Sequence, residues 1–316
     1  TDRTDDVRIH GAQPLITPWV LAEELPLPDA QRHNIARARR EIEAVLRGQD
    51  RRLLVIVGPC SVHDPAALLD FAARLQEGCA PLADAILPVL RVYFEKPRTV
   101  VGWKGLINDP DLDGSFHINK GLRQARKVLL DVATLGLPAA SEFLDTTFGQ
   151  YYADLVSFGA IGARTVESQI HRELASGLSM PVGFKNGTTG NPHCYLILRG
   201  GADSGPNYHP EAIQAAAMAL VTKELPASLI VDCSHGNSNK DPQQQATVVS
   251  SLCDQIEQGQ AAIRGVMLES HLTGGTQPMA DRDQLTYGQS ITDACLSLAE
   301  TLPLLEQLAA TVRRHG

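Results

Sequence analysis

Eight short apolar runs, each rich in Val, Ile and Leu, recur along the chain and alternate with segments of helical pattern. The runs cover residues 53–60, 86–96, 138–144, 160–164, 181–186, 195–201, 228–235 and 265–270. Strands this apolar are typical of a parallel sheet whose two faces are both covered by helices. Eight such strands predict an α/β protein with a (β/α)8 TIM barrel, and the absence of a GxGxxG motif disfavours an open, doubly wound sheet.

Helix signals fill the intervals between these runs. Asp64 and Pro65 begin the first expected helix, because Asp is a favoured N-cap and Pro fits the first helical position. Further helices are expected at 150–158, 168–176, 210–224, 242–259 and 290–315.

The first fifty residues precede the first apolar run. Residues 30–48 carry apolar side chains at helical spacing, so residues 1–50 are predicted to form an arm and a helix. This extension would either cap the barrel floor or reach a neighbouring subunit. The catalytic barrel is expected to span residues 51–316.

The composition is that of an ordinary globular protein, with 43% hydrophobic and 20% charged residues. A net charge of −8 argues against a nucleic-acid partner, because duplex affinity comes mainly from Lys and Arg. No apolar run reaches the roughly 18 residues of a membrane span, and the first residues lack the features of a signal peptide. The six cysteines show no CxxC spacing, so no disulfide framework or structural zinc motif is indicated, and a cytoplasmic location is expected.

The connection between the fifth and sixth runs is too short for this fold. Eight residues separate Asn186 from Tyr195, whereas a parallel crossover needs about a dozen residues or more, usually with a helix. Either the barrel is locally degenerate or a segment is missing between Thr188 and His193. We expect a missing segment, because the motifs on both sides are intact.

Basic residues gather at the ends of the predicted strands, where a (β/α)8 barrel has its active site. Six occupy such positions: Arg91, Lys96, Arg98, Arg164, Lys185 and Arg199. Their convergence would be unfavourable unless anionic ligands offset the repulsion. Arg binds phosphate and carboxylate groups bidentately, so a ligand with more than one anionic group is predicted. The alternative for any single residue is a salt bridge at the barrel rim.

A second set of strand-end residues could hold a metal ion. Cys60, His235 and Glu269 follow the first, seventh and eighth runs, which lie close together in a closed barrel. A thiolate, an imidazole and a carboxylate suit a divalent transition-metal ion. Taken singly, Cys60 also fits a small buried hydrophobic residue, and His235 a structural one. Asp293 is a fourth candidate, but its spacing from Ser290 equally matches a capping box at a helix start.

Four further residues have open interpretations. Gly187 could form a tight turn, and Gly200 with Gly201 could let the backbone approach a phosphate group. Trp103 belongs either to a ligand-binding loop or to the local core.

Several long segments resemble one known family, the type I 3-deoxy-D-arabino-heptulosonate-7-phosphate (DAHP) synthases. The matching segments are GPCSVHDP (58–65), RVYFEKPRT (91–99), GWKGLINDP (102–110), GARTVESQIHRELASGLSMPVGFKNGT (162–188), ILRGG (197–201), VDCSHGNSNKD (231–241) and YGQSITDAC (287–295). The resemblance implies a (β/α)8 barrel that condenses phosphoenolpyruvate with erythrose 4-phosphate in the first step of the shikimate pathway. It also implies one divalent metal ion (Mn²⁺, Co²⁺, Fe²⁺ or Zn²⁺) and a homotetramer built as a dimer of dimers.

The resemblance also implies roles for individual residues. The metal ligands would be Cys60, His235, Glu269 and Asp293. Phosphoenolpyruvate would be held by Arg91, Lys96, Arg164, Lys185 and Arg199, with the backbone of Gly162 and Ala163. Erythrose 4-phosphate would be held by Lys96, Pro97, Arg98 and Thr99. The catalytic residues would be Lys96 as proton donor, Glu142 facing the enolpyruvyl group, and His235.

Regulation by an aromatic amino acid is implied as well, at Gln150, Gly177, Leu178 and Ser179. The segments GLSMPVGFKNG and VDCSHGNSNKD look most like those of tyrosine-sensitive members. The family has additional residues between GFKNGT and ILRGG that build part of an inhibitor site, so the short connection places feedback control in question.

Two other functions remain open. Lys185 could form a Schiff base, as in a class I aldolase. A catalytically inactive barrel that acts as a regulatory partner is the third hypothesis, although every metal and phosphate position is retained.

Overall fold

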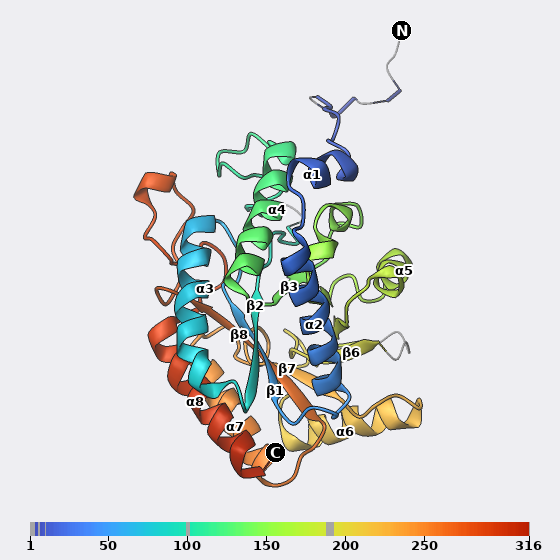
Figure 1. The fold of residues 1–316 in the computed structure, drawn as a ribbon, viewed down its shortest axis with the longest axis vertical. Helices are drawn as coiled ribbons and strands as arrows, with labels where there is room; N and C mark the ends of the chain where they lie inside the picture. The colour runs from blue at the N-terminus through green and yellow to red at the C-terminus, as the bar shows by residue number, and fades with distance from the viewer. Residues whose placement is uncertain (1–3, 6, 10, 99–101, 188–192, 316) are drawn as a thin grey trace.

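The computed structural model describes residues 4–5, 7–9, 11–98, 102–187 and 193–315. In this described part, eight parallel strands form a closed barrel, because β1 pairs with both β2 and β8 (Figure 1). The strands are β1 (Leu53–Gly58), β2 (Ile86–Arg91), β3 (Ala139–Glu142), β4 (Phe158–Ile161), β5 (Val182–Lys185), β6 (Cys194–Leu198), β7 (Leu229–Asp232) and β8 (Ile263–His271). A two-residue strand, β9 (Leu296–Ser297), pairs with the end of β8. The predicted (β/α)8 barrel is confirmed.

Helices surround this barrel on the outside. They are α1 (Pro18–Glu24), α2 (Asp29–Leu46), α3 (Pro65–Cys79), α4 (Ile118–Leu135), α5 (Gln169–Gly177), α6 (Pro210–Thr222), α7 (Gln244–Glu257) and α8 (Leu298–His315). Asp64 caps α3 as predicted, since its side chain accepts hydrogen bonds from the amides of Ala66 and Ala67. The sequence analysis missed α1 and α4. Helix α4 could have been predicted, because its apolar residues, such as Leu122 and Leu129, follow helical spacing.

The helix predicted at residues 150–158 is wrong. Two short 3₁₀ turns stand there instead, Phe148–Tyr151 and Ala153–Leu155. Two arginines bind backbone carbonyls that a regular helix would use internally. Arg126 donates to the carbonyl of Tyr151 at 3.0 Å, and Arg39 donates to those of Ala153 and Val156 at 2.9 and 2.7 Å.

The last helix begins eight residues later than predicted, at Leu298. Ser297 and Glu300 form its capping box: the Ser297 amide donates to Glu300 Oε2 at 2.8 Å, and the Glu300 amide donates to Ser297 Oγ at 3.2 Å. The alternative in which Ser290 and Asp293 cap this helix is therefore wrong.

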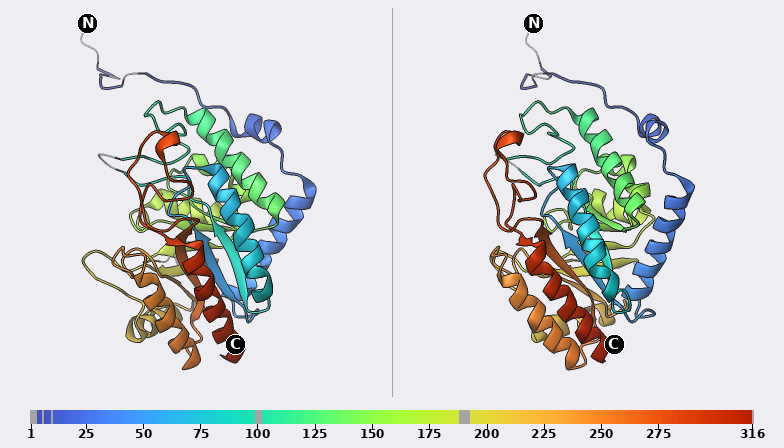
Figure 2. Two further views of the ribbon diagram at one scale, coloured as in Figure 1. Left: turned by 90° about the vertical axis from the view of Figure 1, so that its left-hand side faces the viewer. Right: turned by 60° about the vertical axis from the view of Figure 1, so that its left-hand side comes forward.

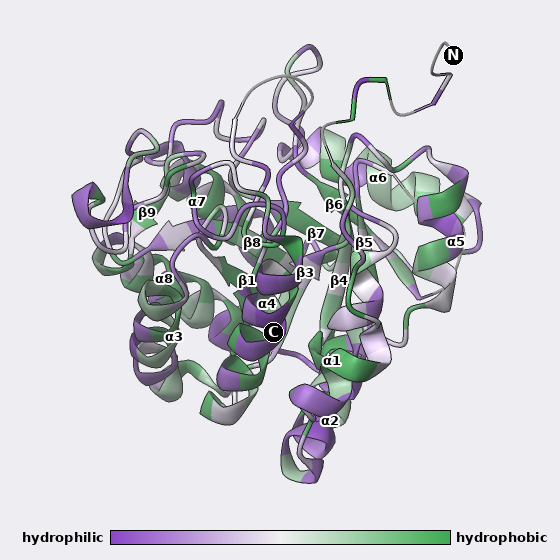
Figure 3. Cartoon of the chain, turned by 90° about the horizontal axis from the view of Figure 1, so that it is seen from above, coloured by the Kyte–Doolittle hydropathy of each residue, from purple (hydrophilic) through white to green (hydrophobic). Residues whose placement is uncertain are grey.

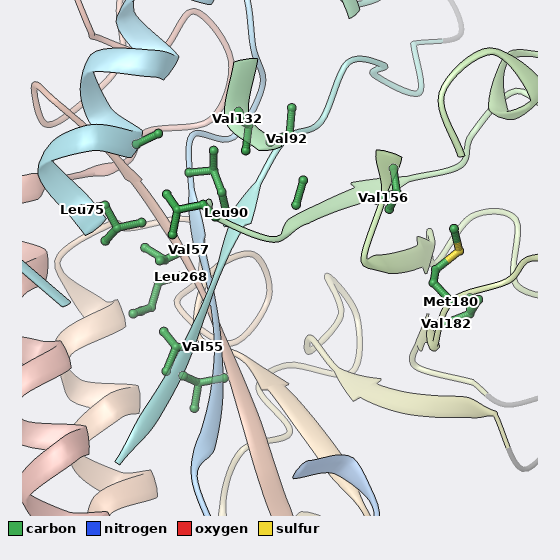
Figure 4. Close-up of a cluster of buried hydrophobic side chains, with 14 of the residues drawn as sticks. Val55, Val57, Leu75, Leu90, Val92, Val132, Val156, Met180, Val182 and Leu268 are labelled. Carbon is green, nitrogen blue, oxygen red and sulfur yellow. The ribbon is translucent and has the colours of Figure 1, made fainter. Parts of the chain in front are cut away.

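The barrel has an inner and an outer core. The inner core combines inward-facing strand residues such as Leu54 and Ile56 with Ile42, Val45 and Leu46 of α2. This helix therefore closes the barrel floor, which was one of the two expected positions. The outer core packs the opposite strand faces against the surrounding helices, with side chains such as Val55, Val57, Leu75, Leu90 and Leu268 (Figure 4).

Loops gather at one end of the barrel, where the strands point (Figure 3). The described residues before α1 form a segment that extends away from the body (Figure 2). Ile16 is where this segment docks, because its amide donates to Asn119 Oδ1 at 2.8 Å and its carbonyl accepts from Tyr151 Oη at 2.5 Å. Among the described residues, none of the helices combines the length and apolar character that a bilayer crossing requires.

Strands β5 and β6 pair directly in parallel, with Val182 opposite Cys194 and Lys185 opposite Ile197. The short connection therefore joins neighbouring barrel strands. Residues 188–192, where a missing segment is expected, lie outside the described residues.

Candidate active site

The candidate site continues the inward-facing positions of the barrel strands. Leu54 and Ile56 of β1 face the interior, and the two-residue alternation of a strand carries this side onward to Cys60. The same alternation brings further residues to the barrel mouth: Arg91, Glu142, Lys185, Arg199, Asp232 and Glu269. Strand geometry thus explains why these distant residues converge.

Three of the four predicted metal ligands lie together. Cys60, Glu269 and Asp293 each offer one ligand atom within 4.8 Å of the other two. Burial raises the pKa of the Cys60 thiol, and the nearby Glu269 carboxylate adds to this effect. Lys96 acts in the opposite direction, since its Nζ donates to Cys60 Sγ at 3.0 Å. Cys60 therefore lies in a charged site and is not simply a buried hydrophobic residue.

His235, the fourth predicted ligand, lies beside this group. Its Nε2 is 3.5 Å from Glu269 Oε1, while its Nδ1 is 2.8 Å from Asp232 Oδ2 and 2.7 Å from Ser234 Oγ. A carboxylate behind a histidine ring is the usual support of a metal-binding imidazole. The backbone of His235 is left-handed, with φ 55°, a conformation that costs free energy in a non-glycine residue and is common at functional sites.

Buried contacts fix the orientation of Glu269. Arg91 Nη2 is 3.0 Å from its Oε1, and Gln245 of α7 binds both its amide and its carbonyl at 2.9 and 3.0 Å. Arg91 Nη1 also donates to the carbonyls of Pro59 and Cys60. The terminal nitrogens of Arg91 thus hold two ligand-bearing segments together.

A cavity of about 140 Å³ opens beside these ligands. All six predicted basic residues line it, together with a seventh: Arg91, Lys96, Arg98, Arg164, Lys185, Arg199 and Lys240. Its described wall holds three carboxylates, those of Glu95, Glu142 and Asp293. The excess of cations makes this cavity suited to a ligand with several anionic groups.

Glu142 and Lys185 form a buried ion pair in this cavity, with Lys185 Nζ 2.9 Å from Glu142 Oε2. Burial opposes ionisation of Glu142, but Lys185 outweighs it and holds the pKa of the carboxyl below its usual range. For Lys185 the same partner outweighs burial, so the pKa of the ammonium is raised.

The segment predicted to hold erythrose 4-phosphate lies directly after β2. Lys96, Pro97 and Arg98 line the cavity, and Arg164 Nη1 donates to the Pro97 carbonyl at 2.5 Å. Thr99 lies outside the described residues. Gly162 and Ala163, whose backbone is predicted to help hold phosphoenolpyruvate, also line the cavity.

The sequence analysis missed four residues of this region: Tyr93, Glu95, Asp232 and Lys240. Tyr93 and Glu95 continue the alternation that begins at Arg91, so strand periodicity could have found them. Asp232 likewise follows the inward-facing Ile230 of β7. Lys240 lies in the turn at residues 235–240, and its sequence position carries no comparable signal.

The structure gives packing reasons for two of the glycines and for Trp103. A Cβ atom on Gly200 would lie 2.6 Å from the Gly236 carbonyl carbon, so this glycine makes room for neighbouring backbone, while a backbone approach to phosphate at Gly200 and Gly201 stays a prediction. At Gly187 a Cβ atom would meet Val166 at 2.5 Å, which is a packing constraint. Trp103 is buried and donates to the Asp109 carbonyl at 2.8 Å, as a residue of the local core does.

The predicted regulatory residues lie away from the barrel mouth. Gly177, Leu178 and Ser179 line a separate cavity of about 330 Å³ next to Arg32 and Arg39 of α2. Gln150 belongs to the turn at Phe148–Tyr151 and is not in the lining of that cavity.

Comparison with known proteins gives the family. The model of the DAHP synthetase I family matches residues 30–190 and 187–305. This chain belongs to the DAHP synthetase I family. Relatives include the "Phospho-2-dehydro-3-deoxyheptonate aldolase, tyrosine-inhibited" of Schizosaccharomyces pombe, 46% identical over 99% of this chain and 94% of that protein. The Phe-sensitive enzyme of Escherichia coli K12 is 48% identical over 99% of each chain.

A solved structure of a family member agrees with the fold. The phospho-2-dehydro-3-deoxyheptonate aldolase of Francisella tularensis SCHU S4 superposes with a TM-score of 0.93 at 44% identity, covering 98% of this chain and 99% of that one. The resemblance to DAHP synthases is therefore confirmed. Because the Trp-sensitive E. coli K12 enzyme is also 47% identical, these identities favour no single effector.

The family comparison also bears on the short connection after β5. The alignment with the S. pombe relative extends over 350 positions, whereas this chain has 316 residues. The family model matches the chain in two parts, residues 30–190 and 187–305, which overlap at residues 187–190. Relatives therefore contain residues that this sequence lacks.

Proposed function

We propose that this chain condenses phosphoenolpyruvate with erythrose 4-phosphate to give DAHP and inorganic phosphate. The observation that carries this proposal is the grouping of Cys60, Glu269 and Asp293 beside a cavity lined by seven cations. The two substrates together bring two phosphates and one carboxylate, which this excess of positive charge would bind.

The donor set fits a divalent metal ion held by Cys60, His235, Glu269 and Asp293. A thiolate, an imidazole and two carboxylates are suitable ligands for Mn²⁺, Co²⁺, Fe²⁺ or Zn²⁺. The Asp232 contact leaves Nε2 of His235 directed at Glu269, as this arrangement requires. When bound, such an ion supplies Lewis-acid polarisation of the aldehyde oxygen of erythrose 4-phosphate.

Different basic residues would bind the two substrates. Arg91, Lys185 and Arg199 lie at the ends of β2, β5 and β6 and, with Lys96 and Arg164, would bind phosphoenolpyruvate. Pro97, Arg98 and Thr99 would bind erythrose 4-phosphate together with Lys96. Holding both substrates in one cavity brings C3 of phosphoenolpyruvate to the aldehyde carbon and removes much of the entropic cost of the reaction.

Two residues would move protons, and a third would hold the metal ion. As C3 attacks, the aldehyde oxygen becomes an alkoxide, and Lys96 would donate the proton that it needs. Water then adds to C2, and Glu142, which Lys185 keeps ionised, would accept the proton that this water loses. Loss of phosphate from C2 leaves the ketone of DAHP. His235 would assist as a metal ligand whose orientation Asp232 fixes.

The test is an activity assay on chelator-treated protein. We expect phosphate release only when phosphoenolpyruvate, erythrose 4-phosphate and one of the four divalent ions are all present. The ion giving the highest kcat at limiting concentration would be the proposed cofactor. Equal phosphate release in the presence of chelator would overturn the metal-dependent reaction.

A Schiff-base mechanism on Lys185 is less well supported. A nucleophilic lysine must lose its proton, whereas Glu142 raises the pKa of Lys185 and keeps it an ammonium. Borohydride trapping with substrate separates the two mechanisms, because only the Schiff base is reduced to a stable adduct. An inactive regulatory barrel would fail the assay above in every condition.

Feedback inhibition by an aromatic amino acid is part of the proposal. The cavity at Gly177, Leu178 and Ser179 is separate from the active site and large enough for a small ligand. Relatives are named for inhibition by, or sensitivity to, tyrosine, phenylalanine and tryptophan. Activity assays with each of the three amino acids test this, and we expect tyrosine to be the strongest inhibitor. If none of the three changed the activity measured without an amino acid, such control would be excluded.

We also propose that the chain assembles into a homotetramer, built as a dimer of dimers, and that it is located in the cytoplasm. Exposed apolar side chains near the N-terminus support a subunit contact: Val7 and Ile9 before α1 are 64 and 58% exposed, and Trp19 of α1 is 74% exposed. The described residues before α1 also project from the body (Figure 2). Sedimentation of the full chain would give the mass of the assembly, and a monomer would contradict it.

A further inference from the structure

Tyr93 lies between two of the cations that we assign to phosphoenolpyruvate. The guanidinium carbon of Arg91 is 3.8 Å from the centre of its ring, and Lys185 Nζ is 5.1 Å from the same point. Both cations are buried, so their attraction to the ring is weakly screened. The ring thus provides a neutral contact that fixes two like charges at defined positions.

The hydroxyl group of Tyr93 is buried and has no hydrogen-bond partner among the residues that the structure describes. Burial also raises the pKa of this phenol, so it remains a hydrogen-bond donor. A buried hydroxyl without a partner is unfavourable and is uncommon in folded proteins. Tyr93 forms part of the wall of the cation-lined cavity, so a ligand in that cavity can supply the missing acceptor.

We propose that Tyr93 is a further substrate-binding residue: its ring positions Arg91 and Lys185, and its hydroxyl donates to an anionic oxygen of phosphoenolpyruvate. This inference rests on the proposed function. The ligand group is a carboxylate or phosphate oxygen, because the two cations at the ring select for anions.

Tyr152 offers a matched control. Its hydroxyl is also buried, with the Ser141 side chain beside it, but Tyr152 is absent from the lining of the cavity. Its ring packs on Phe94 and Phe143, with centroids 5.6 and 5.8 Å apart. Removing this hydroxyl therefore tests the loss of a buried phenol without the loss of a cavity contact.

The experiment compares Tyr93→Phe and Tyr152→Phe with the wild-type protein. For Tyr93→Phe we expect the KM and the calorimetric Kd for phosphoenolpyruvate to rise roughly tenfold to hundredfold, as for loss of a hydrogen bond to a charged group. The KM for erythrose 4-phosphate should change less than about twofold. Tyr152→Phe should leave both KM values unchanged. Both variants keep the ring, so the fold should be retained, and thermal unfolding would verify this.

A third variant tests the role of the ring. Tyr93→Leu removes the contact with Arg91 and Lys185, so kcat should fall in addition to the rise in KM. An unchanged KM for phosphoenolpyruvate in Tyr93→Phe, or an equal rise in Tyr152→Phe, would overturn the proposal. If the wild-type protein fails to condense the substrates, the proposed function fails, while calorimetry with phosphoenolpyruvate alone still decides the role of Tyr93.

Discussion

Lys96 connects the group of Cys60, Glu269 and Asp293 with the cation-lined cavity. Its Nζ donates to Cys60 Sγ at 3.0 Å, and its side chain lines the cavity that also holds Arg98 and Arg164. Metal binding at Cys60 would take over the thiolate and free this ammonium group for the substrate. The two halves of the site are thus coupled through one side chain.

The thiol of Cys60 should be essential for metal-dependent activity. We expect Cys60→Ala to abolish chelator-sensitive turnover while the circular dichroism spectrum stays that of the wild type. Cys79→Ala is the matched control, since Cys79 is equally buried but lies in α3. Full activity in Cys60→Ala would remove this residue from the ligand set.

The cavity cations should separate the two substrates kinetically. Arg199 Nε is buried without a hydrogen-bond partner, so Arg199→Ala should raise the KM for phosphoenolpyruvate roughly tenfold to hundredfold. Arg98→Ala should instead raise the KM for erythrose 4-phosphate. Arg37→Ala, on the exposed side of α2, is the control. Equal changes for both substrates in both variants would contradict the division of roles.

The strands were predictable from local composition, because runs of apolar residues mark them. All eight strands lie in or next to the predicted runs, because barrel strands are apolar on both faces. The helix expected at 150–158 failed because Arg39 and Arg126, distant in sequence, bind its carbonyls. The basic cavity was predictable from the strand ends, whereas the partners of each side chain, such as Asp232 behind His235, depend on tertiary contacts.

The floor helix α2 should contribute strongly to stability. Ile42 is fully buried in the inner core of the barrel, so Ile42→Ala should lower the free energy of unfolding by about 2–5 kcal/mol. Urea denaturation would measure this. The exposed Arg40→Ala serves as control and should change stability by less than about 0.5 kcal/mol. The KM values of Ile42→Ala should stay near those of the wild type, because the floor lies opposite the barrel mouth. If Ile42→Ala lowered the free energy of unfolding by less than about 1 kcal/mol, the side chains of the floor would have repacked around the smaller residue.

At the scale of the whole molecule, one buried acid should make stability depend on pH. Burial raises the pKa of Glu95 from 4.5 to about 8, with Asp145 and Glu142 adding to this effect. Between these two values the folded protein binds a proton that the unfolded chain has lost. Stability conferred by this proton is therefore present below about pH 4.5 and is lost as the pH rises to about 8.

Replacing this acid should remove that pH dependence. Relative to wild type, Glu95→Gln should gain free energy of unfolding between pH 5 and pH 8, by an amount on the order of a few kcal/mol. Urea denaturation across this pH range would measure the difference. Glu211→Gln, at an exposed position of α6, should give a curve parallel to that of the wild type. If the free energy of unfolding of Glu95→Gln changed with pH in the same way as that of the wild type, Glu95 would be ionised in the folded state.

The helix that closes the barrel floor has a consequence for synthesis on the ribosome. Ile42 emerges early, but its inner-core partner Met267 on β8 follows 225 positions later. Strand β1 likewise needs β8 as a neighbour. A nascent chain therefore carries the apolar face of α2 and one open edge of the sheet until β8 has been synthesised. The barrel is sealed by α2, β1 and β8 together, so the time between the synthesis of α2 and that of β8 is when the chain most needs protection from aggregation.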